Sequence, residues 1–148
     1  QVYVPYLKRR GVRLAIAGSI CSRMGINDHT LVKLGYVDDL DRLYASAKMV
    51  IAPIRYGAGC NIKLLEAMSY GKPIIATSKA FHFSPCNRTD GLLIEDDPAM
   101  FGERIIEVLS SREKLSELST NSLKFINAYH SQDRYDKAMD DVFGRILE

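Results

Sequence analysis

Apolar runs rich in β-branched residues alternate with helical patterns along the chain. Successive runs begin roughly 17–24 residues apart, which is the length of a strand–helix–strand crossover. The runs lie at 12–17, 32–37, 49–52, 73–77 and 92–94. The third and fourth are almost continuously apolar, as is typical of parallel strands covered on both faces. The pattern therefore predicts an α/β fold with a doubly wound, Rossmann-like parallel sheet of about five strands.

Helical patterns fill the intervals between these runs. Asp38 and Asp39 can cap a helix whose apolar positions follow the spacing i, i+3, i+4, i+7. Those positions are Leu40, Leu43, Tyr44 and Ala47. A second helix is predicted over 61–70, because Gly71 follows it directly and Pro73 comes two residues later.

After the fifth run the chain becomes helical to its end. Asp97 caps a helix with Pro98 at its first position, and Ser110 with Glu113 resembles a capping box that opens the next helix. An apolar stripe from Tyr135 to Leu147 marks a last, amphipathic helix. Two interpretations of this stripe stay open: it closes the core of this domain, or it packs onto a partner domain outside the chain.

Length and charge fit one domain. The chain has 148 residues, 47% hydrophobic residues and a formal net charge of +2, which disfavours both disorder and nucleic-acid binding by bulk charge. We expect a single domain over 1–148, with 112–148 as a helical tail. Because residue 1 is Gln, we also expect this domain to be a fragment of a longer protein.

The cysteines and histidines give little sign of a metal site. The three cysteines are widely spaced and form no CxxC pair, so we expect reduced thiols in a cytoplasmic protein. His82 and Cys86 would supply only two ligands, where zinc generally takes at least three from the protein. No metal site and no cofactor are predicted.

The loop after the third run is the most informative candidate site. In open parallel sheets, ligands bind beyond the carboxyl ends of the strands. Residues 54–61 leave a strand, turn through Gly57 and Gly59, and enter a helix. Free amides at a helix N-terminus suit a phosphate, although many such loops are only tight turns. Arg55 is expected to point either toward that phosphate or toward solvent.

Glu66 lies in the helix that follows this loop, within a mostly apolar segment. A carboxylate in such a setting needs hydrogen-bond partners if it is buried. One interpretation is an exposed i, i+3 pair between Lys63 and Glu66. The other is a carboxylate that accepts hydrogen bonds from ligand hydroxyls, such as those of a ribose.

Residues 57–77, GAGCNIKLLEAMSYGKPIIAT, closely resemble the donor-binding core of retaining GT-B glycosyltransferases, the group 1 transferases related to glycogen and sucrose synthases. Segments 14–18, 34–37 and 91–94 also fit the order of that family. The resemblance implies one half of a GT-B fold. It implies a donor domain that binds a nucleotide diphosphate sugar, for transfer to an acceptor hydroxyl with retention and usually without a metal.

The resemblance also implies roles for individual residues. Glu66 corresponds to the glutamate that binds the ribose hydroxyls, and Lys63 either adds a cation or is simply solvated. The nucleobase side is expected at Gly18, Tyr36 and Val37. The donor sugar and diphosphate are expected along a segment made of Gly57, Ala58, Gly59, Cys60, Asn61 and Ile62.

Three departures from the family pattern affect what can be expected. Ala58 occupies the position of the family's first glutamate, the loop over 79–90 does not match, and the diphosphate-gripping Arg and Lys would lie upstream of this chain. Catalytic residues therefore stay unknown, and the fragment alone is expected to be inactive.

The expected partners are a nucleotide diphosphate sugar and an N-terminal acceptor-binding domain, with no nucleic acid. Membrane contact is expected only through the full-length protein. Two alternatives remain: a non-catalytic binding or scaffolding module that kept the fold, and another GT-B enzyme such as a nucleotide-sugar epimerase.

Overall fold

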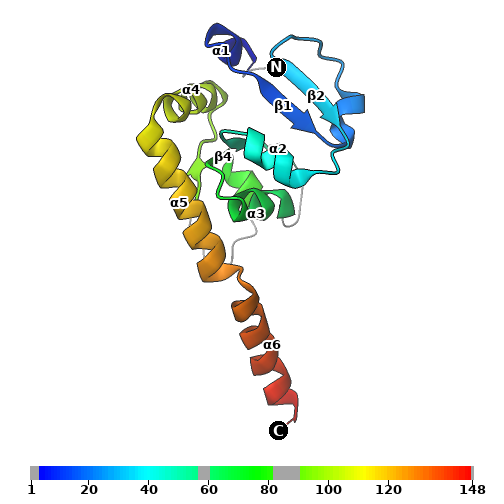
Figure 1. The fold of residues 1–148 in the computed structure, drawn as a ribbon, viewed down its shortest axis with the longest axis vertical. Helices are drawn as coiled ribbons and strands as arrows, with labels where there is room; N and C mark the ends of the chain where they lie inside the picture. The colour runs from blue at the N-terminus through cyan, green and yellow to red at the C-terminus, as the bar shows by residue number, and fades with distance from the viewer. Residues whose placement is uncertain (1–3, 57–60, 82–90, 148) are drawn as a thin grey trace.

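A computed structural model describes residues 4–56, 61–81 and 91–147. Figure 1 shows an α/β body from which the last helix projects. In chain order, the elements of the described residues are α1 (Val4–Arg9), β1 (Leu14–Ala17), the 3-10 helix η1 (Ser19–Arg23), β2 (Leu31–Gly35), α2 (Leu40–Ser46), β3 (Val50–Ala52), α3 (Ile62–Ser69), β4 (Ile74–Ala76), the 3-10 helix η2 (Ser78–Phe81), β5 (Leu93–Ile94), α4 (Pro98–Ser110), α5 (Arg112–Tyr129) and α6 (Gln132–Leu147).

All strand pairs in the described residues are parallel, and each of the five predicted runs contributes a strand. The strands fall into a β1–β2 pair and a three-stranded sheet in the order β3–β4–β5. The prediction of about five strands in one sheet was therefore wrong in the number of strands per sheet, because the larger sheet has three. No backbone ladder joins the two groups within the described residues. The β1–β2 pair also contains no buried residue, whereas every residue of β4 is buried.

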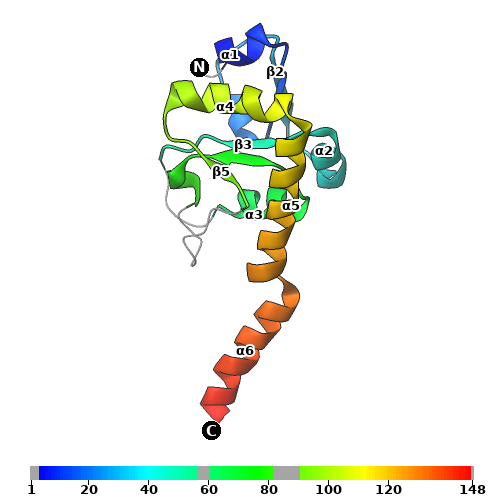
Figure 2. The ribbon, with the colours of Figure 1, turned by 90° about the vertical axis from the view of Figure 1, so that its left-hand side faces the viewer.

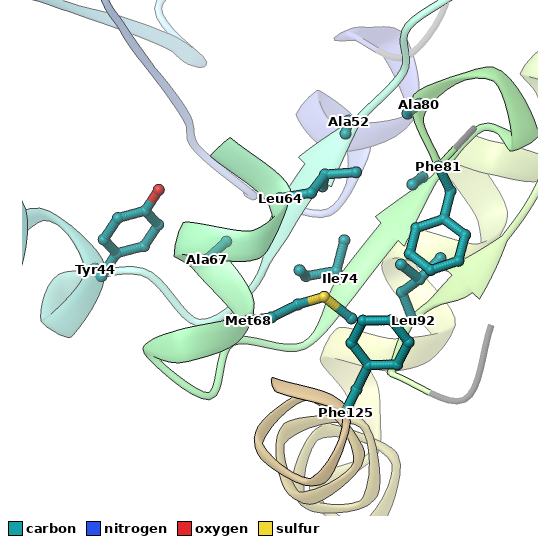
Figure 3. Packing of buried hydrophobic residues seen from close by; sticks show 11 residues of the cluster. Tyr44, Ala52, Leu64, Ala67, Met68, Ile74, Ala80, Phe81, Leu92 and Phe125 are labelled. Atoms are coloured by element: carbon teal, nitrogen blue, oxygen red, sulfur yellow. The ribbon is translucent and has the colours of Figure 1, made fainter. Parts of the chain in front are cut away.

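The core is organised around β4, whose successive side chains point to opposite faces. Ile74 and Ala76 join a cluster with residues of α3 and α5, including Met68 and Phe125. Ile75 joins a second cluster with Leu7 of α1 and residues of α4. Figure 2 shows α3 and α4 on either side of the sheet, and Figure 3 shows the first cluster at close range. Helices thus cover β4 on both faces, as its apolar run predicted.

Helix boundaries follow the capping signals. The Asp39 side chain accepts a hydrogen bond from the Arg42 amide, and Asp97 accepts from the amides of the second and third residues of α4. Gly71 ends α3 with a φ of 63°. The capping box at Ser110 was misplaced by one residue, because Ser110 is the last residue of α4 and Ser111 caps α5.

The two C-terminal helices differ sharply in burial. Phe125 of α5 is 3% exposed, and Ser122 of the same helix lies fully buried within reach of the Lys72 and Gly91 carbonyls. Over residues 132–143 of α6, by contrast, no side chain is buried, and both ribbon views show this helix extending away from the body. Over residues 132–143, the stripe on α6 therefore does not close the core of this domain. Its packing onto a partner domain stays a prediction.

In the part of the chain that the structure describes, no helix combines the length and the apolar character that crossing a bilayer requires.

We expect Phe125→Ala to lower the free energy of unfolding by about 3–5 kcal/mol, because it removes a fully packed ring from the core. The matched control is Tyr135→Ala on α6, whose side chain is 61% exposed, with an expected effect within about 0.5 kcal/mol. Urea unfolding of both variants measures the difference. Equal losses would show that α6 packs against the body in solution.

Candidate functional site

The candidate site is assembled where β3 ends and α3 begins. The Thr77 side chain, at the end of β4, donates a hydrogen bond of 2.5 Å to the Ile54 carbonyl. The Thr77 amide also donates to Ala52, the last residue of β3. These bonds hold the exit of β3 against β4. The segment that leads toward α3 therefore starts from a fixed point at the carboxyl edge of the sheet.

Several predicted site residues lie outside the part of the chain that the structure describes. Gly57, Ala58, Gly59 and Cys60 lie outside the described residues, as do His82 and Cys86. Among the residues described, no three His, Cys, Asp or Glu side chains gather as a metal centre would require.

The start of α3 is described, and it is open to solvent. Asn61 occupies the capping position without a side-chain cap, and Ile62 is 69% exposed. Lys63 is exposed as well. The first amides of any helix have no acceptor within the helix. The entrance to α3 therefore offers N–H donors that a bound anion can use.

Glu66 lies one turn further along α3 and is half-buried. Its Oε1 atom accepts a hydrogen bond of 2.8 Å from the hydroxyl of Tyr44 on α2. No ion pair joins Lys63 and Glu66, both of which the structure describes. The interpretation of Lys63 and Glu66 as an exposed pair was therefore wrong, because the partner of this carboxylate is the buried phenol of Tyr44.

Tyr44 is the residue that sequence reasoning missed. Its place in the apolar stripe of α2 identified it only as a core position, and it is indeed 8% exposed. A buried tyrosine hydroxyl nevertheless needs a polar partner, and this requirement was the available signal. Figure 3 shows the Tyr44 ring beside α3, near Ala67.

A second tyrosine completes the contact between α2 and α3. Tyr70, one residue past the end of α3, stacks on Tyr44 with ring centroids 4.5 Å apart and an angle of 18° between the planes. The Tyr70 hydroxyl donates a hydrogen bond of 2.5 Å to Asp41 of α2. We call Tyr44 and Tyr70 the tyrosine pair. Each of the two hydroxyls donates to a carboxylate across the gap between the two helices.

Both phenols of the tyrosine pair are stabilised as hydrogen-bond donors. Burial, together with the bond to Glu66, raises the pKa of Tyr44 well above its ordinary value of 10.0. The pKa of Tyr70 is also raised, chiefly by its hydrogen bond to Asp41. Both hydroxyls therefore keep their protons at neutral pH.

The residues predicted for the nucleobase side lie together at the end of the β1–β2 pair. The Gly18 amide donates to the Gly35 carbonyl, which places Gly18 beside the residue before Tyr36. Gly18 has a φ of 101°, a conformation that favours glycine. Tyr36 is 85% exposed and Val37 half-buried. The structure thus brings Gly18 and Tyr36 to one edge, where the Tyr36 ring is exposed.

Residues 2–111 match the family model described as glycosyl transferases group 1. The chain belongs to this family, and its fold is that of GT-B glycosyltransferases.

Three known proteins illustrate the similarity. A glycosyltransferase from Rickettsia africae superimposes with a TM-score of 0.79 at 13% identity, over 99% of this chain and 43% of that one. HepE from Anabaena, solved in complex with UDP and glucose, gives a TM-score of 0.74 at 13% identity, over 97% of this chain and 44% of that one. An uncharacterized 44.6 kDa protein in the cps region of Klebsiella pneumoniae is 27% identical over 72% of this chain. The chain spans only 26% of that relative.

The raised pKa of Tyr44 gives a prediction for alkaline solution. A folded-state pKa above the unfolded value means that this group stabilises the fold fully below about pH 10, and that the stabilisation is lost as pH rises through the folded-state pKa. We expect the free energy of unfolding of the unmodified chain to fall more steeply above about pH 10 than that of Tyr44→Phe. Urea unfolding across this pH range measures both slopes. Parallel slopes would contradict the buried hydrogen bond.

Proposed function

We propose that this chain is the donor-binding domain of a retaining glycosyltransferase, and that it holds a nucleotide diphosphate sugar at the carboxyl edge of its sheet. The observation that carries this proposal is the half-buried Glu66 carboxylate, fixed by Tyr44 one turn inside α3. Membership of the group 1 family supports the reaction class. The complexes of HepE with UDP and with UDP-glucose support a nucleotide sugar as the ligand.

In this proposal each part of the site meets one part of the donor. The Glu66 carboxylate accepts hydrogen bonds from the ribose hydroxyls, since an ionised carboxylate is an acceptor only. Ile62 and Lys63, together with the segment 57–61, lie along the diphosphate and the sugar, where helix-end amides favour negative charge. The exposed ring of Tyr36, with Gly18 and Val37, borders the base.

The proposed catalytic contribution of this domain is electrostatic. When the bond from the sugar to the diphosphate breaks, negative charge builds up on the leaving group. Donors that are already oriented toward that charge lower the barrier. The amides at the entrance of α3 are such donors. The acceptor site and the remaining cations are expected outside this chain, so we propose that the chain binds donor without turning it over.

One observation favours a second candidate, a module that kept the fold and binds ligand without catalysis. Ala58 stands where the family commonly has its first glutamate. Assay of the full-length protein with UDP-glucose and an acceptor separates the two candidates. Release of UDP that depends on the acceptor supports the enzyme, whereas UDP binding without release supports the module.

Glu66→Gln tests the proposed ligand site. UDP added to the unmodified chain at millimolar concentration should shift NMR signals clustered within residues 57–66. Hydrogen bonds to a charged group are worth about 1.5–3 kcal/mol, so the substitution should weaken UDP binding by about tenfold or more. The matched control is Glu113→Gln on the exposed start of α5, which should bind as the unmodified chain does. Signals that move elsewhere, or equal affinity for all three proteins, would refute the assignment.

A further inference from the structure

We propose that Tyr44 is a positioning residue that sets the preference of this site for a ribose diol. It does so by holding one oxygen of Glu66, which leaves the other oxygen directed to the nucleotide. This inference rests on the proposed function. It adds a residue of α2, outside the loop and the helix that carry the proposed site, and it assigns that residue a measurable effect on ligand choice.

The contact between α2 and α3 is reciprocal. Tyr44 of α2 donates to Glu66 of α3, and Tyr70, at the end of α3, donates back to Asp41 of α2. The two rings stack between these bonds. Tyr44 is 8% exposed, whereas Tyr70 is 38% exposed. The bond from Tyr44 to Glu66 therefore has little competition from water, and it fixes its acceptor more firmly than the bond from Tyr70 to Asp41 does.

The chemistry of Glu66 explains why a fixed orientation matters. The last torsion of a glutamate is broad and roughly two-fold, so an unrestrained carboxylate samples many orientations. Tyr44 occupies Oε1. Among the described groups, no donor bonds to Oε2. A restrained carboxylate with one open oxygen can accept from a ribose hydroxyl without first losing rotational freedom, which is the advantage of preorganisation.

Tyr70 provides a matched control for the positioning role of Tyr44. Tyr44→Phe removes the hydroxyl that reaches Glu66 but keeps a ring to stack on Tyr70. Tyr70→Phe removes the hydroxyl that reaches Asp41 and also keeps the stack. Both variants lose one phenol–carboxylate bond between the same two helices. A purely structural role would make their effects alike, whereas a positioning role singles out Tyr44.

The experiment compares the Kd of UDP with that of its 2′,3′-dideoxy analogue, by calorimetry, for the unmodified chain, Tyr44→Phe and Tyr70→Phe. We expect the unmodified chain to prefer UDP by about tenfold or more. Tyr44→Phe should reduce that preference to about threefold or less, mostly by weakening UDP, and Tyr70→Phe should keep it. Thermal melts of the two variants check that both are folded.

The experiment distinguishes failure of the proposed function from failure of the role given to Tyr44. If the unmodified chain does not bind UDP, or binds both nucleotides equally, the proposed function fails at Glu66. If it prefers UDP and Tyr44→Phe keeps that preference, only the role of Tyr44 is overturned. Equal loss of preference in both tyrosine variants also overturns it, since the cause would then be general packing of α2 on α3.

A measurement on the unmodified chain covers the case in which Tyr44→Phe does not fold. The hydroxyl proton of Tyr44, observed by NMR, should shift when UDP binds, because the ribose withdraws charge from the shared carboxylate. It should not shift with the dideoxy analogue. A signal that is unchanged by UDP would overturn the inference.

Discussion

The hydrogen bond between Tyr44 and Glu66 is the interaction on which the site depends. It satisfies two groups that would each be costly to bury alone: a phenol hydroxyl in the core and a carboxylate at its edge. Loss of either partner would leave the other without its partner in a partly desolvated place, which costs more than the bond itself contributes. The bond also joins α2 to α3. The bond therefore fixes the position of α2 relative to α3 beside the proposed ligand site.

The packing of the other α3 residues explains why the position of Glu66 is fixed. Leu64, Ala67 and Met68 occupy one face of the helix and are buried against β4 and α5. Residues on this face cannot move without disturbing a close-packed core. Glu66 lies beside that face, turned toward α2, while Ile62 and Lys63 remain exposed at the entrance. One helix of eight residues thus combines an anchored side, a polar contact to its neighbour and an open N-terminus.

Much of the fold could be predicted from local signals in the sequence. The apolar run that became β4 predicted burial on both faces, and Asp39, Asp97 and Gly71 marked helix ends that the structure confirms. The division of the strands into two groups could not be predicted, because strand pairing depends on contacts between distant segments that periodicity does not encode. For the same reason the partner of Glu66 was not found: Tyr44 lies 22 positions earlier in the chain, and its apolar spacing concealed its polar role.

The central claim is that Glu66, held by Tyr44, faces the ribose of a bound nucleotide. A crystal structure of the chain with UDP tests it most directly. The account predicts a ribose hydroxyl within hydrogen-bond distance of the Glu66 carboxylate, with the Tyr44 hydroxyl still on the other oxygen. A nucleotide bound elsewhere, or a Glu66 side chain turned out into solvent beside an unpaired Tyr44, would contradict it.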